Sequence, residues 1–277
     1  MNILVCIKQV PGTAKVEIDP VTGVMRRDTA DAKLNPYDLY AVEEALALAE
    51  STGGTVTALS MGPPQAREAL LEAVYMGAGR AALVSDRRFA GSDVLATAYV
   101  LSQAASRLGF DLIVCGKQTT DGDTAQVGAE MAEFLDIPHA ANVLSIRTGA
   151  DADGGDAGGD ADVGAELPGL VVAAGQENRI ITQYIPLPCL LCVDGGVNTP
   201  RLPSYKRRKE LNADPVQVLT LTDMFDRDEQ HYGLMGSPTQ VERTYTPDDS
   251  ISHETITGGS GHVAARLAAI FADRKYI

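Results

Sequence analysis

The residues best suited to chemistry lie together in one loop, CGKQTTDGDTAQVG, at positions 115–128. A short apolar run leads into this loop as a strand would, and a run of helical character, residues 124–135, follows it. A strand that feeds a glycine-bearing turn at the start of a helix can cradle a phosphate, because backbone N–H groups and the positive helix end point at the anion. Thr119, Thr120 and Thr124 add three hydroxyl groups to the same loop. The loop therefore predicts a turn that binds an anion.

Two carboxylates in this loop limit the ligands that it can bind. Asp121 and Asp123 would repel a phosphate unless they face a ribose or cap the helix. We interpret the loop as a nucleotide site that contacts sugar and phosphate together. A plain capped turn without a ligand is the alternative.

The cysteines and histidines offer little further chemistry. Cys189 and Cys192 form a CxxC pair, which could be redox active or half of a zinc site. The sequence has no second such pair, and its four histidines lie far from this one. We expect two structural cysteines that face opposite sides of a buried strand. No histidine has a partner in a nucleophile elbow, and a nucleotide site without catalytic groups implies that the ligand itself carries the chemistry.

Two charged segments have simple interpretations. The Asp/Gly-rich stretch 149–164 begins with the spacing of a calcium loop, but Gly155 stands where an oxygen ligand is needed and Asp156 where glycine should make the turn. We expect a solvated hairpin insertion there. The basic run KRRK at 206–209 would suit a phosphate or an acidic partner, and a solvated loop is the default.

The elements that must position the loop alternate between strand and helix patterns. Apolar runs at 3–7, 56–61, 82–85 and 112–115 predict buried strands. Helical patterns between them begin after Asn35, at Pro64 and after Ser92, and end at glycines. This order predicts an α/β fold, a Rossmann-like, doubly wound and mostly parallel sheet that binds ligands at the carboxyl ends of its strands.

The second half of the chain follows another pattern. Strand-like runs at 142–147, 169–174, 179–183 and 187–193 follow each other with little helix between, which predicts added strands. From residue 226 the chain is polar and rich in turns until a final helix at 261–273. We expect a nucleotide-binding domain over residues 1–225 and an arm over 226–277 that lies on another subunit.

Composition excludes several classes of protein. The chain has 277 residues and a net charge of −14, which disfavours nonspecific binding to nucleic acid or anionic membranes. Neither a membrane span nor a basic leader segment is evident. Four cysteines are too few for a disulfide scaffold, and those at 6 and 115 lie in apolar runs, so we expect reduced thiols in a cytoplasmic protein.

Six segments, in order along the chain, resemble the β subunit of electron-transferring flavoproteins over nearly the whole length. The most specific is GKQTTDGDTAQVGAEMAEFL at 116–135. The others are VCIKQVPGTAKVEIDP, LNPYDLYAVEEAL, SMGPPQAREAL, VNTPRLPSYKRRK and GSPTQVERTYTP. The resemblance implies a Rossmann-like α/β domain whose C-terminal arm embraces an α subunit. Only the insertion at 149–164 has no counterpart.

This family has two functional types. In the housekeeping type the β subunit holds AMP as a structural ligand, and the protein passes electrons between acyl-CoA dehydrogenases and other carriers. In the bifurcating type the β subunit holds a second FAD, which takes a hydride from NADH. Its two electrons are then divided between the α-subunit FAD or a dehydrogenase and a low-potential ferredoxin or flavodoxin.

Two segments resemble the bifurcating type, VSDRRFAGSDVLATAYVL at 84–101 and DGDTAQVG at 121–128. The AMP type tends to carry a bulkier, acidic DDDCNQTG in the second segment. Gly122 lowers the local negative charge and clears the backbone for a pyrophosphate. We therefore expect FAD, with AMP as the alternative. A stand-alone nucleotide sensor of the universal-stress type is a further alternative, although such a sensor needs no long polar tail.

The resemblance assigns roles to particular positions. Thr124 and the N–H groups of the three residues after it would bind phosphate, and the Arg87 guanidinium would stabilise an anionic reduced flavin. The cofactor-binding residues that it implies are Cys6, Asn35, Met61, Arg87, Phe89, Asp93, Thr97, Thr119, Gly122, Thr124, Ala125, Gln126 and Val127.

The loop 194–203 resembles the family's recognition loop, which docks on an acyl-CoA dehydrogenase. Val197 stands where the family has an anchoring leucine, and we expect it near the loop tip, with Leu202 packed back on the domain. The partner-docking residues implied are Val197, Asn198, Pro200 and Arg201.

Overall fold

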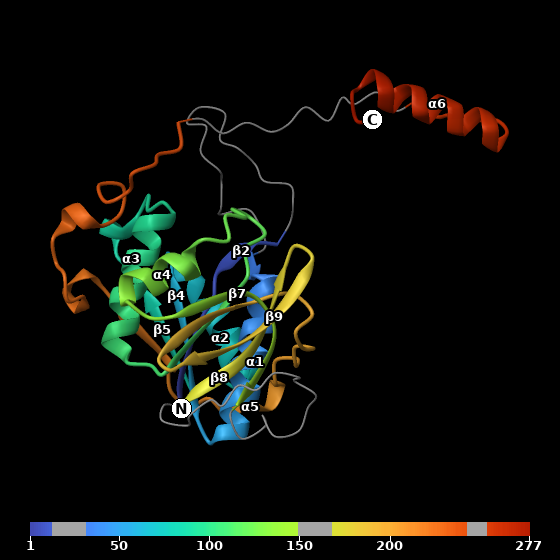
Figure 1. The fold of residues 1–277 in the computed structure, drawn as a ribbon. Coiled ribbons are helices and arrows are strands. Elements are labelled where there is room, and N and C mark those ends of the chain that lie inside the picture. Colours follow the sequence, from blue (N-terminus) through green and yellow to red (C-terminus); the bar gives the residue numbers. More distant parts are fainter. Residues whose placement is uncertain (13–31, 149–167, 243–253) are drawn as a thin grey trace.

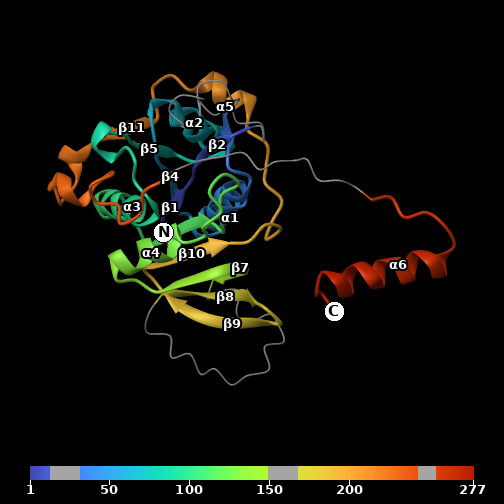
Figure 2. The ribbon, with the colours of Figure 1, turned by 90° about the horizontal axis from the view of Figure 1, so that it is seen from above.

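The computed structural model describes residues 1–12, 32–148, 168–242 and 254–277. The predicted hairpin insertion at 149–164 lies outside the described residues. In the described ranges the chain forms an α/β body with a separate C-terminal helix, shown from two sides in Figures 1 and 2.

A nine-stranded sheet forms the centre of the body, in the order β11-β5-β4-β1-β6-β10-β7-β8-β9. The strands from β11 to β7 in that order run parallel, and β8 and β9 continue the sheet as an antiparallel hairpin. Their bounds are β1 (Asn2–Cys6), β4 (Thr55–Met61), β5 (Arg80–Val84), β6 (Leu112–Gly116), β7 (His139–Thr148), β8 (Gly169–Gln176), β9 (Arg179–Pro186), β10 (Cys189–Val193) and β11 (Val216–Leu219). A small second sheet pairs β2 (Gln9–Pro11) with β3 (Ala32–Leu34).

Helices cover both faces of the parallel strands. Helices α1 (Pro36–Thr52) and α2 (Arg67–Met76) pack on one face, and α3 (Val94–Leu108) and α4 (Val127–Leu135) on the other (Figure 2). Alternate side chains of β1 divide between these layers, since Ile3 and Val5 join the first core and Leu4 and Cys6 the second. Burial on both faces explains why the strands are continuous apolar runs. The predicted doubly wound, mostly parallel fold with added strands is confirmed.

The ends of several helices differ from the prediction. Asp93 rather than Ser92 caps α3, because the Asp93 side chain accepts the N–H of Ala96. Helix α4 begins at Val127, three residues later than the pattern suggested, and a 3-10 turn (Pro64–Ala66) precedes α2. Asn35 precedes α1 as expected, but its side chain makes no cap bond.

The predicted C-terminal arm divides into two parts. Residues 226–242 pack on the body, where Tyr232 is only 1% exposed in the core beside α3. Helix α6 (Ser260–Asp273) has no buried residue and stands apart from the sheet (Figure 1). The first part of the predicted arm therefore packs on this chain's own body, through the buried Tyr232 and Ser237. That the rest of the arm lies on another subunit stays a prediction. None of the described helices is long and apolar enough to cross a membrane.

Candidate nucleotide site

The predicted loop leaves the sheet at the carboxyl end of β6, beside the carboxyl end of β1. Asn35, fully buried at the start of α1, holds the first half of this loop from below. Its Nδ2 donates to the carbonyl of Gln118 at 2.8 Å, and its Oδ1 accepts the N–H of Thr120 at 3.2 Å. Asn35 thus lies at the predicted site and shapes the backbone there.

The first of the two loop carboxylates has a cationic partner. Lys8 Nζ lies 2.7 Å from an Asp121 carboxylate oxygen. Burial works to raise the pKa of Asp121, but the hydrogen bond and charge of Lys8 outweigh it and the pKa is lowered. Neutralisation by Lys8 removes most of the repulsion that Asp121 would exert on a bound phosphate.

The second half of the loop leaves the start of α4 open. Asp123 and Ala125 adopt positive φ values of 53° and 55°, which side chains rarely take and which cluster at functional sites. The N-cap residue Gln126 makes no side-chain cap bond, and no described residue accepts the N–H groups of Ala125, Gln126 or Val127. Unpaired N–H groups at a positive helix end are suited to binding an anion.

The loop residues around this turn are accessible. Gly122, Thr124, Ala125 and Gln126 are exposed, and Thr119 is half-buried. Among the described residues, a Cβ at Gly122 would meet only Thr119 Oγ1 and Lys8 Nζ, at 3.7 and 4.0 Å, so these residues leave open space there. The structure brings these predicted phosphate and ribose residues together at one turn.

A buried carboxyl group lies beneath the loop. Asp38, in the first turn of α1, accepts the N–H of Lys8 at 2.7 Å and packs so closely on Gly116 that a Cβ there would collide with it. Burial raises the pKa of Asp38 to about 7, against the opposing effect of the N–H of Lys8. Asp38 therefore ties the ends of β1 and β6 to α1 and titrates near neutral pH.

Three thiols line the same edge of the sheet. Cys6, Cys115 and Cys192 stand in register on the neighbouring strands β1, β6 and β10 and face the α3–α4 layer. Gly128 of α4 rests on this row, because a Cβ there would collide with Cys192 Sγ. Cys189 faces the opposite layer, as predicted for a structural CxxC. Hydrogen bonding to Cys115 and burial raise the pKa of Cys192, so this thiol stays protonated.

The residues predicted for the flavin side have different environments. Arg87 is exposed in the short turn after β5, and its guanidinium makes no hydrogen bond or ion pair with any described residue. Thr97 is half-buried in the first turn of α3, and Met61 is half-buried at the end of β4. Phe89 is 4% exposed and packs against Tyr232 with the two rings tilted by 47° and their centroids 5.4 Å apart.

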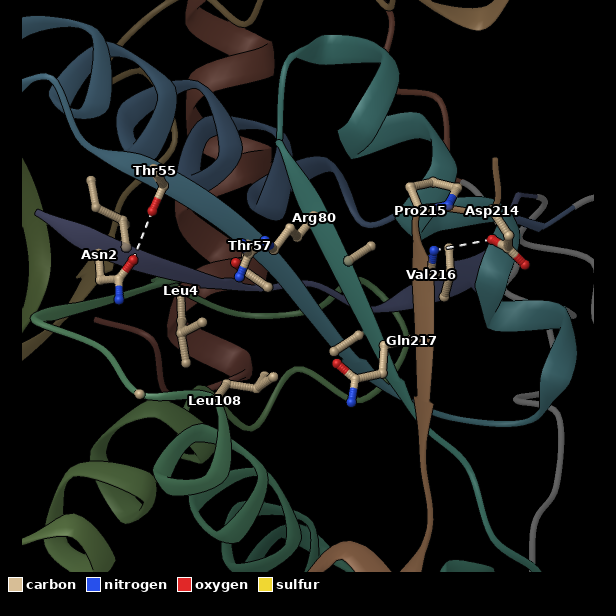
Figure 3. Close-up of a pocket in the computed structure, with 14 residues that line it drawn as sticks. Asn2, Leu4, Thr55, Thr57, Arg80, Leu108, Asp214, Pro215, Val216 and Gln217 are labelled. Carbon is tan, nitrogen blue, oxygen red and sulfur yellow. Dashed lines mark hydrogen bonds between the residues drawn. The ribbon is translucent and has the colours of Figure 1, made fainter. Parts of the chain in front are cut away.

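A hollow of about 400 Å³ opens at the opposite end of the parallel strands from the loop 115–128 (Figure 3). It lies at the amino ends of β1, β4, β5 and β11. Its lining includes two apolar side chains, Leu4 and Leu108, and three polar ones, Thr57, Arg80 and Gln217. Ligands of doubly wound sheets bind at the carboxyl ends of the strands. This rule favours the loop 115–128, at the carboxyl ends of the strands, over the hollow as the ligand site.

Comparison with known proteins agrees with this geometry. The family model described as "Electron transfer flavoprotein domain" matches residues 22–224. The chain is 42% identical to "Electron transfer flavoprotein subunit beta" of Thermoanaerobacterium thermosaccharolyticum over the whole of both chains. The chain belongs to the electron transfer flavoprotein family.

Other relatives in this electron transfer flavoprotein family carry two names. The β subunit of Clostridium acetobutylicum is 37% identical, again over the whole of both chains. "Protein FixA" of Sinorhizobium fredii is 36% identical over 98% of this chain and 94% of its own length. The family resemblance predicted from the sequence is confirmed.

The predicted recognition loop, residues 194–203, is hydrogen bonded to helix α1. Arg201 donates to the Glu43 carboxylate through its backbone N–H and its Nε, both at 2.9 Å. Its Nη1 lies 2.6 Å from a Glu50 carboxylate oxygen. Asn198 Nδ2 donates to the Tyr40 carbonyl and to a Glu44 carboxylate oxygen, at 3.0 and 2.9 Å. The predicted docking residues Asn198 and Arg201 therefore bind helix α1 and fix the shape of the loop.

The expected apolar anchor of this loop was placed wrongly. Val197 is half-buried and packs against the core, whereas Leu202 is 87% exposed. The reason is that the bonds of Asn198 draw the first half of the loop onto α1. Pro200 is half-buried in the same loop. Leu202 is thus the side chain that this loop presents.

Sequence reasoning missed Lys8 and Asp38, although each lies within three residues of the end of an element. Lys8 lies two residues after β1, and Asp38 is the third residue of α1. A charged residue so near the carboxyl end of a central strand was the available signal. Their partners, Asp121 and the N–H of Lys8, lie 113 and 30 residues away, and such pairs become visible only in the fold.

Proposed function

We propose that this chain is the β subunit of a heterodimeric electron transfer flavoprotein of the bifurcating type, with FAD bound at the loop edge of its sheet. The open start of α4 would hold a phosphate through the N–H groups of Ala125, Gln126 and Val127. Thr119, Thr124 and the space over Gly122 would receive the neighbouring sugar and phosphate groups. Cys6 and Met61, at the ends of β1 and β4, would line the adenosine side.

The observation that favours FAD over AMP is the unused guanidinium of Arg87. It follows β5, and the phosphate loop follows β6, three strand spacings away in the order β5-β4-β1-β6. Parallel strands lie about 4.8 Å apart, so roughly 14 Å separates the two strand ends. A mononucleotide on the loop would leave Arg87 without a partner, whereas a dinucleotide is long enough to reach it.

Bound FAD would supply the hydride-accepting and electron-transferring chemistry. Arg87 would favour a negatively charged, reduced flavin by Coulomb attraction. NADH is the proposed hydride donor. The two electrons would pass to the α-subunit FAD or a dehydrogenase and to a low-potential ferredoxin or flavodoxin.

Two surfaces are available for the proposed partners. The α subunit would cover helix α6, whose Leu267 and Phe271 are exposed here. The loop 194–203 would present Leu202 to an apolar pocket on an acyl-CoA dehydrogenase-like protein. Rigid support by Arg201 and Asn198 lowers the entropy that docking would cost.

The number of flavins per heterodimer tests the proposal. The chain is purified together with its α subunit, the complex is denatured, and FAD and AMP are quantified in the released fraction. We expect two FAD per heterodimer and no AMP. One FAD and one AMP would instead identify the housekeeping type, in which this subunit carries no redox ligand.

A further inference from the structure

A strap formed by residues 232–239 crosses the start of α3. The Asp93 N–H donates to Ser237 Oγ at 2.8 Å, and Ser237 Oγ in turn donates to the carbonyl of Gly233 at 2.7 Å. Thr239 donates to Asp93 Oδ2 twice, through its backbone N–H at 3.0 Å and its Oγ1 at 2.7 Å. The strap is therefore bonded to the N-cap of helix α3. This N-cap lies within the segment 84–101 that is predicted to face the flavin (the flavin-side segment).

The Asp93 carboxylate is fully engaged within the protein. Its Oδ1 accepts the N–H of Ala96 at 3.0 Å, and its Oδ2 accepts both donors of Thr239. Burial opposes ionisation, but these hydrogen bonds lower the pKa of Asp93 overall. A carboxylate that already accepts three hydrogen bonds has little capacity left for a sugar hydroxyl.

The strap also fits the backbone of the flavin-side segment directly. Gly233 has a φ of +57°, and a Cβ there would collide with the carbonyl of Arg88. The N–H of Leu234 donates to the carbonyl of Ala90 at 3.1 Å. Tyr232 of the strap is buried against the Phe89 side chain. The strap therefore holds the turn that carries Arg87 through a side-chain contact as well as through backbone contacts.

We infer that Asp93 is a positioning residue, which fastens the flavin-side segment to the strap, and that the strap thereby sets the affinity of the site for its dinucleotide. The inference rests on the proposed FAD site. Its physical basis is that Arg87 and Thr97 flank the fastened N-cap, so release of the strap lets both move away from the geometry that the ligand needs. The same strap leads into the C-terminal arm. It therefore links the proposed FAD site to the part of the chain that the proposed α subunit would bind.

Thr239→Val tests the inference in the heterodimer with its α subunit. The variant removes one of the two donors to Asp93 and keeps the side-chain shape. We expect the Kd for FAD added to the stripped heterodimer to rise roughly tenfold, the size of one lost charge-assisted hydrogen bond. Amide exchange of residues 86–97 should become faster. Thr239→Ser should restore both, and Thr182→Val on the exposed strand β9 should change neither.

Asp93→Asn separates positioning from direct contact. If Asp93 acts through the strap, this variant and Thr239→Val have the same effect, and the double variant is no worse than either alone. Loss of FAD in Asp93→Asn with wild-type affinity in Thr239→Val would show a direct ligand contact and overturn the inference, as would unchanged exchange in Thr239→Val. Absence of FAD from the unmodified heterodimer would contradict the proposed function, while the exchange measurement would still decide the role of the strap.

Discussion

Asp38 is a carboxyl group buried beneath the nucleotide loop, and its environment has a consequence for stability. Among the described residues its hydrogen-bond donors are backbone and amide groups, because the Lys8 ammonium is bonded to Asp121. Burial raises its pKa to about 7, whereas an unfolded aspartate titrates near 3.9. Between these pH values the folded chain binds a proton that the unfolded chain does not. Stability therefore falls as the pH rises from about 4 to about 7.

Asp38→Asn should remove this dependence. A raised pKa costs at most about 1.4 kcal/mol per pH unit, so from pH 5 to pH 8 the variant should gain roughly 2–3 kcal/mol relative to the unmodified chain. Urea unfolding of the isolated chain at several pH values measures the difference. Asp121→Asn is the control. Because the pKa of Asp121 is lowered, its protonation changes stability only at pH values below the range from 5 to 8. Parallel curves for Asp38→Asn and the unmodified chain would show that Asp38 is ionised throughout.

At the scale of elements, the start of α4 carries the proposed phosphate site. Thr124→Glu places a carboxylate beside the open N–H groups, where it repels a phosphate and takes its place at the positive helix end. The expected cost is about 1.5–3 kcal/mol of binding free energy, measured as nucleotide retained and as the Kd for added FAD. Gln183→Glu on the exposed strand β9 adds the same charge far from the loop and should leave binding unchanged. Undiminished nucleotide in Thr124→Glu would move the phosphate elsewhere.

Apolar periodicity predicted the elements better than their ends. The parallel strands and four covering helices were predictable, because burial on two faces or one stripe leaves a clear pattern in the sequence. The late start of α4 was not, since Asp123 and Ala125 take left-handed backbone conformations in a stretch that is helical by composition. The N-cap of α3 was missed by one residue because Ser92 and Asp93 are both good caps. The contacts of the strap decide between them in favour of Asp93.

The same limit applies to the site. The loop that carries the proposed phosphate site could be singled out because glycine, threonine and a helix start are local signals. Which loop residue faces solvent is a tertiary property, and for this reason Val197 and Leu202 were exchanged. The strap was hidden because one tyrosine and two hydroxyl groups hold it, which leaves no periodicity in the sequence.

At the scale of the whole molecule, the chain combines a packed α/β body with a C-terminal helix, α6, that has no buried residue. Tyr232 and the bonds of Asp226 to Tyr99 and His231, at 2.7 and 2.6 Å, fix the chain as it leaves β11. Helix α6 then exposes its apolar side chains, including Leu267 and Phe271. An amphipathic helix of this kind is stabilised by tertiary packing more than by its own propensity. The proposed α subunit would provide that packing, so only the part of the tail beyond the strap depends on it.

If the loop 194–203 docks on a partner as proposed, electron delivery and cofactor binding depend on different residues. Leu202 is exposed, and none of its neighbours in the loop belongs to the phosphate turn. Leu202→Asp should keep its flavin and its reduction by NADH. Electron transfer to the partner dehydrogenase should slow strongly, because burying an unpaired carboxylate costs several kcal/mol. Ile180→Asp, on the exposed edge strand β9, is the matched control and should leave transfer intact. Val197→Asp should instead destabilise the chain itself, since Val197 packs on the core. Flavin loss in Leu202→Asp with normal transfer per bound flavin would place the loop in the cofactor pocket.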